Sequence, residues 1–341
     1  MKPIDLAEGG LVPDWLIRRG IRSLLRRRLA QEHINDPEAQ ARRYRDLIDE
    51  LRESAIAIET DKANEQHYEV PAAFYELALG SHLKYSSAYW PAGVNNLDQA
   101  EVAMLEQTCE HADLAEGHDI LELGCGWGSL TLWMAGRYPG SRITAVSNSA
   151  SQRAHIEARA LELGFDNIEV ITCDVNELKL DRQFDRVVSV EMFEHVRNYR
   201  NLLQRVGGWM KPQARLFVHI FCHRHLAYPF ETEGEGNWMG KYFFTGGLMP
   251  AADTLLHFCD DVQIEKRWIF SGNHYAKTAR AWLDNMDARR DAVRQVMQST
   301  HGDDAAVWQQ RWRMFFMACE ELFAFDHGNA WLVAHYRFTR R

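Results

Sequence analysis

The chain has 341 residues, of which 46% are hydrophobic, and it carries a formal net charge of −9. This length suits one large α/β domain with additions or two domains, and the hydrophobic content supports a sizeable core. The acidic balance argues against nucleic acid as a partner. No apolar run reaches the roughly 18 residues that indicate a membrane span, and residues 1–10 lack the order of a signal peptide.

The positions of the cysteine and histidine residues indicate whether the chain forms disulfides or binds a metal. The six cysteines are scattered and form no Cys-x-x-Cys pair, which is typical of a reducing compartment and disfavours disulfides or structural zinc. We therefore expect a cytoplasmic protein. Three histidines and a cysteine gather over residues 219–225, but their spacing does not form the two ligand pairs of a zinc site. We therefore predict no metal and expect these residues to form polar lining of an active site: His219, Cys222, His223 and His225.

The N-terminal part of the chain is mostly helical in pattern. Apolar residues recur at helical spacing over residues 12–59, with a second helix expected over 37–59 and six arginines between residues 18 and 28. A basic amphipathic helix can lie on an anionic membrane, but more often it packs on its own domain. Peripheral membrane contact therefore stays open. An approach segment over 60–110 ends in a clear helix at 98–111.

The most informative segment is residues 121–128, Leu-Glu-Leu-Gly-Cys-Gly-Trp-Gly. It predicts a strand, a tight turn and a helix start. Gly124, Gly126 and Gly128 have no side chain to block a ligand and can take positive φ, and the helix N-terminus supplies unpaired N–H groups. The G-x-G-x-G spacing disfavours a nicotinamide dehydrogenase. With Glu122 just before it, the turn resembles motif I of the class I S-adenosylmethionine-dependent methyltransferases.

Strand and helix patterns alternate over the rest of the chain. This alternation predicts a mostly parallel sheet with helices on both faces. A mostly helical stretch of roughly sixty residues separates the last two strands, which is long for a connection. The expected strands are 119–123, 142–147, 168–172, 184–190, 215–221, 262–270 and 331–338.

Residues that follow the strands are candidates for cofactor binding, because ligands of open α/β sheets lie beyond the carboxyl ends of the strands. Ser147, Asn148 and Gln152 follow the second strand, and both amides can donate and accept hydrogen bonds. Asp174 follows the third strand, where it can accept from an adenine amino group while Val175 packs on the ring. A lone aspartate there is more often a turn former, but its position favours the cofactor role.

After the fourth strand the chain reads Glu-Met-Phe-Glu-His over 191–195. If a helix begins here, Glu191, Glu194 and His195 share one face at i, i+3 and i+4 and titrate as a group. Such a set suits a cationic amine, because carboxylates attract the ammonium and a base must remove its proton. His195 has an intrinsic pKa near neutral, as a general base needs. An acidic helix start favoured by the macrodipole is the plain structural alternative.

Together with 85–90 upstream and 273–278 downstream, this run resembles the cyclopropane fatty acid synthase superfamily, and within it the coclaurine N-methyltransferase group. The resemblance covers nearly the whole chain. It implies a class I Rossmann-like fold with a mostly parallel seven-stranded sheet whose last strand is antiparallel. It also implies a division into an N-terminal helical lid (1–110), a cofactor-binding core (111–225), and pocket insertions with the strands that complete the sheet (226–341).

The resemblance also implies roles for single residues. In the N-methyltransferase group the positions of Glu191, Glu194 and His195 line the amine site, whereas lipid-type members typically carry glycine at the position of Glu191. In those lipid enzymes bicarbonate is the base, and its ligands match Ser87 (usually a cysteine), Glu194, His219, the main chain near Phe221, and Tyr275. Tyr85 and Ser86 are implied cofactor contacts, and the implied substrate pocket comprises Ser87 and an aromatic wall of Phe243, Phe244 and Trp331.

Three functions follow from these observations. The favoured one is S-adenosylmethionine-dependent N-methylation of a small, partly aromatic amine. The second is transfer of a methyl or methylene group to unsaturated acyl lipids, with bicarbonate as a further ligand. The third is a non-catalytic protein that only binds the cofactor, since a fold does not prove an activity. The sequence leaves a homodimer open.

Overall fold

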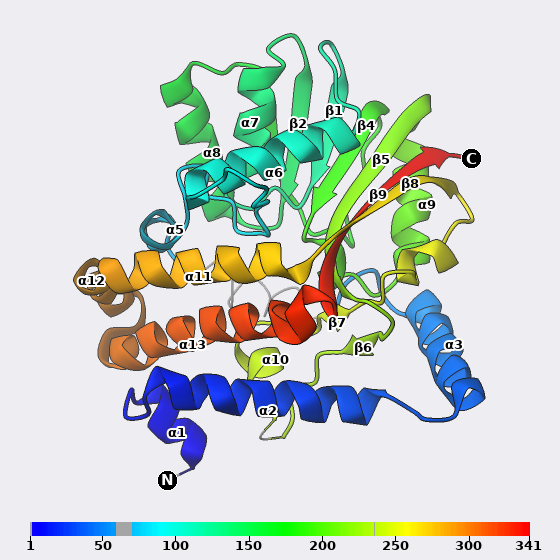
Figure 1. Ribbon diagram of the computed structural model, residues 1–341. Helices are drawn as coiled ribbons and strands as arrows, with labels where there is room; N and C mark the ends of the chain where they lie inside the picture. The colour runs from blue at the N-terminus through cyan, green and yellow to red at the C-terminus, as the bar shows by residue number, and fades with distance from the viewer. Residues whose placement is uncertain (1, 59–69, 235) are drawn as a thin grey trace.

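The computed structural model describes residues 2–58, 70–234 and 236–341. A seven-stranded sheet with the order β3-β2-β1-β4-β5-β9-β8 forms the centre of the molecule (Figure 1). β1 to β5 run parallel, and β9 runs antiparallel between β5 and β8. This confirms the predicted sheet and its antiparallel last strand. The strands are β1 (Asp119–Leu123), β2 (Arg142–Ser147), β3 (Ile168–Thr172), β4 (Phe184–Val190), β5 (Met210–His223), β8 (Val262–Phe270) and β9 (Trp331–Arg340).

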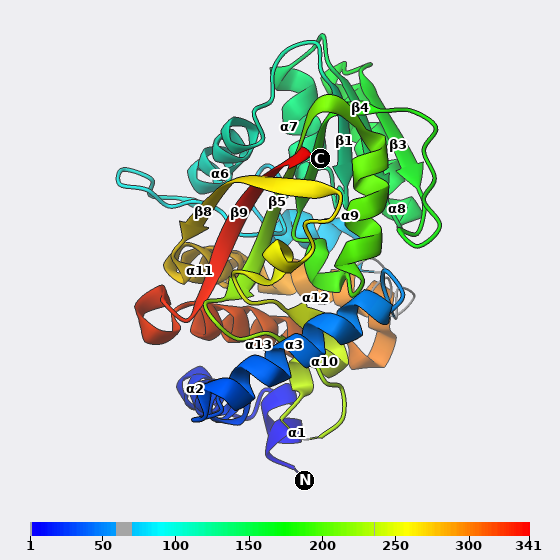
Figure 2. The same ribbon diagram turned by 90° about the vertical axis from the view of Figure 1, so that its right-hand side faces the viewer.

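Helices cover both faces of the sheet, as predicted (Figure 2). Leu105, Met134 and Ile156 pack three helices on one face, whereas Ile48 and Leu202 pack two on the other. Burial of these apolar stripes against the strands supplies the core. On the first face lie α6 (Leu97–His111), α7 (Ser129–Arg137) and α8 (Ala150–Leu163), and on the second α3 (Pro37–Glu53) and α9 (Tyr199–Trp209).

The second predicted N-terminal helix is shorter than its pattern indicated. α3 begins at an Asp36 cap and ends at Glu53 instead of residue 59. The Asn198 amide donates to the carbonyl oxygens of Arg52 and Ser54, which satisfies the helix end. The residues after α3 then turn toward the segment that follows β4, where Arg197 N–H donates to Ile56 O. Residues 59–69 of the approach segment lie outside the described residues.

A helical layer lies beyond the carboxyl ends of the parallel strands (Figure 1). Its main part is the predicted insertion between the last two strands. The layer consists of α1 (Pro3–Glu8), α2 (Asp14–Glu32), α5 (Ala72–Ala78), α10 (Trp238–Tyr242), α11 (Gly272–Ala288), α12 (Arg290–His301) and α13 (Ala305–Phe323). A small sheet pairs β6 (Tyr228–Pro229) with β7 (Leu248–Met249) beside it, which the sequence pattern did not indicate.

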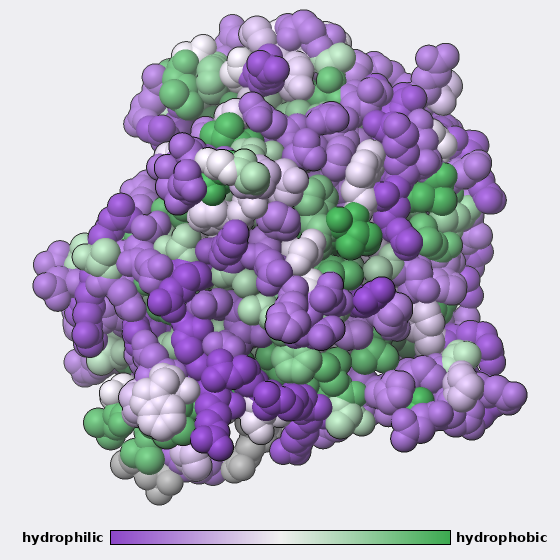
Figure 3. All heavy atoms as spheres, viewed as in Figure 1, coloured by the Kyte–Doolittle hydropathy of each residue, from purple (hydrophilic) through white to green (hydrophobic). Residues whose placement is uncertain are grey.

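The basic helix α2 packs on its own domain. Arg18 forms ion pairs with Glu320 and Glu321 of α13, and Arg22 pairs with Glu321. Apolar residues gather at the exposed N-terminal end of α2 (Figure 3), where Trp15 is 64% exposed. Among the described helices, none is long and apolar enough to cross a membrane. Peripheral membrane contact and a homodimer stay predictions, as does the three-part division of the chain.

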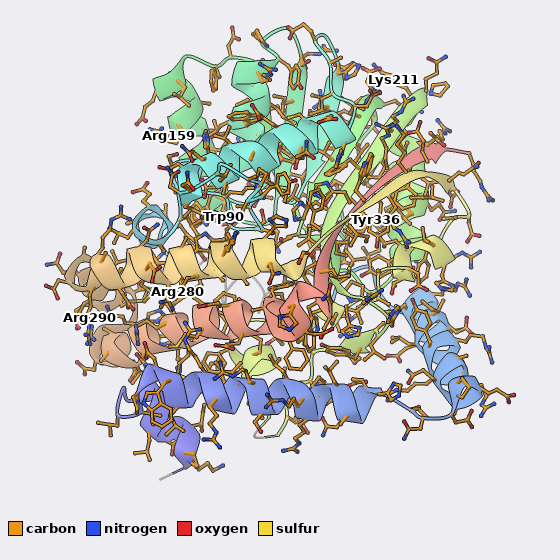
Figure 4. The ribbon with its side chains drawn as sticks, in the orientation of Figure 1. Trp90, Arg159, Lys211, Arg280, Arg290 and Tyr336 are labelled. Carbon is orange, nitrogen blue, oxygen red and sulfur yellow. The ribbon has the colours of Figure 1, made fainter. Side chains whose placement is uncertain are left out.

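The two ends of the sheet differ in what covers them. Figure 4 shows Lys211 at the end far from the helical layer, where its amino group pairs with Asp119 and Asp185 at the start of β1 and β4. Trp90 lies between α6 and α11, and its indole N–H donates to Thr278. The segment before Trp90 is thereby held between the layer and the carboxyl ends of the strands.

Candidate active site

The glycine turn after β1 forms an open cradle, as predicted. Gly124, Gly126 and Gly128 have φ of 80°, 53° and 83°. A Cβ at Gly124 would lie 2.7 Å from the Met192 side chain, and one at Gly128 would lie 2.6 Å from Ile156. At Gly126 the added atom would meet nothing within 4 Å. The turn therefore packs tightly on both sides and leaves open space at its middle glycine.

A crevice at the carboxyl ends of the strands collects all the predicted cofactor residues. One end contains Gly124 and Gly126 together with Ser147, Asn148, Gln152, Asp174 and Val175. The other end shares Gly124, Gly126 and Gln152 and adds Tyr85 and Ser86. Within it Ser147 Oγ donates to Gln152 Oε1 at 2.6 Å. Asp174 also accepts from Asn176 N–H at 2.7 Å, so it serves as a turn former as well.

Glu122 lies in the wall of this crevice. It is buried, and the Thr131 hydroxyl donates to it at 2.5 Å. Burial raises the pKa of this carboxyl to about 8, and the hydrogen bond from Thr131 opposes the rise only in part. The carboxyl group is therefore largely protonated at neutral pH.

Replacing Glu122 with glutamine should stabilise the protein at alkaline pH. Because the pKa is raised in the folded state, the stabilisation from the protonated carboxyl is complete at low pH and is lost as pH rises from about 4.5 to about 8. We expect the variant to match the parent near pH 5 and to exceed its melting temperature by about 5 °C near pH 8.5. Calorimetry at both pH values tests this. The exposed Glu157→Gln serves as control, and a pH-independent difference would contradict the assignment.

The segment after β4 does not form the predicted helical face. Glu191 has φ of +46°, and only Phe193–His195 forms a short 3-10 helix. A left-handed backbone at a residue other than glycine costs about 1–3 kcal/mol and persists only where the surroundings impose it. This bend breaks the i, i+3, i+4 phase. It turns Glu191 and Glu194 toward different partners, so the prediction of one shared helical face is wrong.

The carboxylate of Glu191 is held by three neighbours at the edge of the crevice. Its Oε1 accepts from Ser87 N–H at 2.9 Å and lies 3.2 Å from His219 Nε2, while its Oε2 accepts from the Tyr275 hydroxyl at 2.6 Å. Burial raises the pKa of Glu191, and the buried amino group of Lys84 opposes that rise. Glu191 thus has a pKa above its ordinary value and a hydrogen-bond partner at each oxygen.

These contacts decide the fit of bicarbonate. Ser87, His219 and Tyr275 match bicarbonate ligands of the lipid enzymes, but here they bind the carboxylate of Glu191. The main chain of Phe221, a fourth matching ligand, donates to Glu194 Oε1 at 3.0 Å. The residues present therefore do not fit a bicarbonate ion. Ser87 contributes its main-chain N–H, while its hydroxyl turns to Ala88 O, which corrects its prediction as a pocket wall.

Glu194 is fully buried, whereas His195 is half-buried in the wall of the crevice. Glu194 Oε2 has no hydrogen-bond partner among the described residues. Burial raises the pKa of Glu194 far above its usual range, and the charge of Glu191 adds to the rise. Burial lowers the pKa of His195 to about 4. The expectation of a histidine base with a pKa near neutral is therefore wrong, because the imidazole is held neutral and weakly basic in the apolar surroundings.

A second cavity of about 380 Å³ adjoins the crevice. The two spaces share Phe221, Phe244, Tyr275 and Phe315, so Tyr275, which donates to Glu191, lies where they meet. Phe244 stacks parallel to His195 with ring centroids 5.6 Å apart. The far end of the cavity is lined by α2, including Leu25, Arg27 and Arg28. The cavity is thus aromatic near the reacting centre and polar at its far end.

Two of the predicted wall residues lie behind this cavity. Phe243 is fully buried and stacks on Phe315 with centroids 4.2 Å apart, and Trp331 is fully buried and donates from its indole to the Tyr228 hydroxyl at 3.0 Å. They support the residues that line the cavity. This corrects their prediction as the wall itself, whereas Phe244 lies where it was expected.

Some residues that line the site were not predicted from the sequence. Lys84, Met192 and Phe315 line the crevice, although the sequence did not single them out as site residues. Lys84 offered a signal, since it is a lone cation in an apolar and aromatic run. The expected polar lining after β5 is not found: His219 is fully buried and reaches the site only through Glu191, and His223 Nδ1 accepts from the main-chain N–H groups of His225 and Leu226.

Comparisons with known proteins agree with this geometry. The mycolic acid cyclopropane synthetase family matches residues 57–332. An (S)-coclaurine N-methyltransferase of Thalictrum flavum subsp. glaucum is 38% identical, over 100% of this chain and 95% of that protein. A crystal structure of coclaurine N-methyltransferase bound to N-methylheliamine and SAH superposes with a TM-score of 0.95 at 34% identity, over 98% of each chain. The cyclopropane-fatty-acyl-phospholipid synthase of Escherichia coli K12 is 30% identical over 64% of this chain and 55% of its own length.

The matches confirm the superfamily and the cofactor class that residues 121–128 and 191–195 indicated. They extend over both the crevice and the helical layer. The chain belongs to the mycolic acid cyclopropane synthetase family and is an S-adenosylmethionine-dependent methyltransferase.

Proposed function

We propose that the enzyme N-methylates a small, hydrophobic, partly aromatic amine. The observation that carries this proposal is the carboxylate of Glu191, which lines the crevice and accepts a hydrogen bond from Tyr275, a residue that lines both the crevice and the aromatic cavity. A carboxylate there attracts an ammonium group, whereas an unsaturated acyl chain offers it no charge. The coclaurine N-methyltransferases among the relatives support the same substrate class.

The crevice fits S-adenosylmethionine. Gly126 leaves room for close approach, Tyr85 and Ser86 line one end, and Asp174 and Val175 line the other. When bound there, the cofactor supplies a methyl group activated on a sulfonium centre. The protein's own contribution is to bind the amine, remove its proton and exclude water from the reacting centre.

The two glutamates differ in protonation, and therefore in the part each can take in proton transfer. Donors surround both oxygens of Glu191, so its ionised form is the favoured one. Glu194 accepts a hydrogen bond from Phe221 N–H, and burial raises its pKa far above the usual range, which favours the protonated form. Pairs of carboxyl groups whose environments separate their pKa values commonly act as base and neutral partner. We assign Glu191 as the base that takes the ammonium proton and frees the nitrogen lone pair.

Methyl transfer from labelled S-adenosylmethionine tests this function. The panel pairs secondary amines of the tetrahydroisoquinoline type with their carbocyclic analogues, and adds vesicles of unsaturated phospholipid. We expect label in the amines and none in the analogues or acyl chains. Label in the acyl chains would favour the lipid function, and cofactor binding without transfer to any acceptor would favour a non-catalytic protein.

Replacing Gly124 with alanine should weaken cofactor binding about 10-fold or more. The new Cβ would strain a backbone with φ of 80° and lie 2.7 Å from Met192, which lines both ends of the crevice. Calorimetry with S-adenosylhomocysteine measures the change. Gly164→Ala is the control, since it has φ of 72° and open space at the end of α8. Equal affinity in the two variants would contradict the cradle.

Replacing Phe244 with alanine should raise the KM for the amine about 10-fold while lowering kcat less. The ring packs against His195, Phe221 and Phe230 at the mouth of the cavity, and its loss removes apolar contact area from the bound amine. Steady-state kinetics with the preferred amine measure both constants. The exposed Leu161→Ala serves as control. An unchanged KM would remove Phe244 from the substrate wall.

A further inference from the structure

Three histidines form a continuous hydrogen-bonded chain that leads away from Glu191. His219 Nε2 lies 3.2 Å from Glu191 Oε1, and His219 Nδ1 lies 2.8 Å from His335 Nε2. His335 Nδ1 in turn lies 2.8 Å from His111 Nδ1. The first two rings come from neighbouring strands, since His219 of β5 pairs directly with His335 of β9. The third comes from the last residue of α6.

The chain crosses the apolar core and ends near the surface. His219 and His335 are fully buried, and the ring of His335 packs against Phe217 and Phe270. His111 keeps 7% of its exposure and stacks on Trp268 with ring centroids 3.9 Å apart. Buried imidazoles are costly unless their nitrogens are hydrogen-bonded. In this chain both nitrogens of His219 and of His335 have a partner.

The linked bonds allow only two arrangements of the protons. A neutral imidazole carries one N–H, so a donor at one end of a ring requires an acceptor at the other. Either every N–H points toward Glu191, or every N–H points toward His111. An ionised Glu191 favours the first arrangement, since its oxygen then receives an N–H from His219 Nε2. At the other end, His111 Nε2 becomes an acceptor on the more exposed ring.

We propose that His335 and His111 are positioning residues, which hold His219 in the tautomer that donates from Nε2 to Glu191 and so keep that carboxylate ionised. The inference rests on the proposed amine N-methylation, in which Glu191 is the base. His335 acts only through His219, and His111 acts only through His335. Neither lines the crevice or the cavity described above.

Other charged and titratable groups face the two ends of the chain. Near Glu191 they are Lys84, Glu194, His195 and Tyr275, and near His111 they are Glu110, Lys266 and Arg337. Desolvation lowers the pKa of all three chain histidines, and nearby cations lower it further, with only Glu110 opposing at His111. The three imidazoles are therefore neutral at physiological pH, as a tautomer-specifying chain requires.

Two variants of His335 separate positioning from packing. His335→Gln keeps a side-chain N–H that can donate to His219 Nδ1, whereas His335→Leu keeps similar bulk and removes the donor. We expect the leucine variant to shift the acid limb of kcat/KM upward by about one pH unit, because Glu191 loses its N–H donor and gains a proton more readily. At pH values below the limb its kcat/KM should fall about 10-fold, and it should recover above the shifted limb. The glutamine variant should stay within about threefold of the parent.

Nitrogen-15 NMR of histidine-labelled enzyme, bound to S-adenosylhomocysteine, reads the tautomer without any turnover. We expect His219 to carry its proton on Nε2 in the parent and in His335→Gln, and to lose that single tautomer in His335→Leu. A parent His219 protonated on Nδ1 would overturn the proposal. So would a uniform loss of rate at every pH in His335→Leu. The NMR result stands even if the amine activity fails, so the two hypotheses can be judged separately.

Discussion

Replacing Glu191 with glutamine is expected to lower kcat about 10³-fold at pH 7, while affinity for S-adenosylhomocysteine stays within a few-fold of the parent. A positioned general base typically contributes 10²–10⁴-fold, and the amide can neither attract the ammonium nor take its proton. Glutamine keeps the size of the side chain and one carbonyl oxygen that accepts from Tyr275 or from Ser87 N–H. Steady-state methyl transfer and calorimetry measure the two quantities.

The matched control is Glu169→Gln on β3, which removes an exposed carboxylate that forms an ion pair with Arg182. It should leave kcat unchanged. If Glu191→Gln kept kcat within threefold of the parent, the base would have to lie elsewhere, and Glu194 would be the next candidate because its Oε2 lacks a hydrogen-bond partner among the described residues.

Replacing Glu191 with glycine is expected to lower kcat at least as much, and small planar anions should restore part of it. The variant opens a space among three groups that bind a carboxylate in the parent: Ser87 N–H, the Tyr275 hydroxyl and His219. Formate or bicarbonate at millimolar concentration can take that place and accept the ammonium proton. We expect a recovery of about 10-fold or more with either anion and none with chloride.

The backbone at Glu191 makes this variant a fair test. Its φ of +46° is a conformation that glycine adopts without strain, so the fold should tolerate the change. Glu191→Gln is the internal control, because its amide still fills the space and should block rescue. A glycine variant that binds S-adenosylhomocysteine normally but gains nothing from any anion would contradict the role assigned to the three neighbours of Glu191.

The sheet and the cofactor crevice could be predicted from sequence because their signals are local. Most strands of the parallel part contain a short apolar run, and the turn at Gly124, Gly126 and Gly128 follows directly from its spacing. Residues such as Asn148 and Asp174 could be placed because parallel strands bring their carboxyl ends to one edge. Chain order therefore sufficed to gather these side chains in one crevice.

The catalytic detail depends on contacts between distant segments, which no local pattern reveals. The shared face expected for Glu191, Glu194 and His195 failed because the main chain bends to positive φ, where Glu191 meets Ser87 and Tyr275 across more than eighty residues of sequence. The prediction that His195 acts as a base used its intrinsic pKa near neutral, but burial lowers that pKa to about 4. Strand pairing between β5 and β9 joins His219 to His335, which are separated by 116 positions in the chain.

The most direct test of the central claim is a crystal structure of the enzyme with S-adenosylhomocysteine and the N-methylated product of its preferred amine. We expect the product nitrogen to lie within hydrogen-bond distance of the Glu191 carboxylate, about 3 Å, with its apolar body in the cavity beside Phe244. A product nitrogen bound elsewhere, with a separate anion between Ser87 and Tyr275, would contradict the assignment of Glu191 as the base.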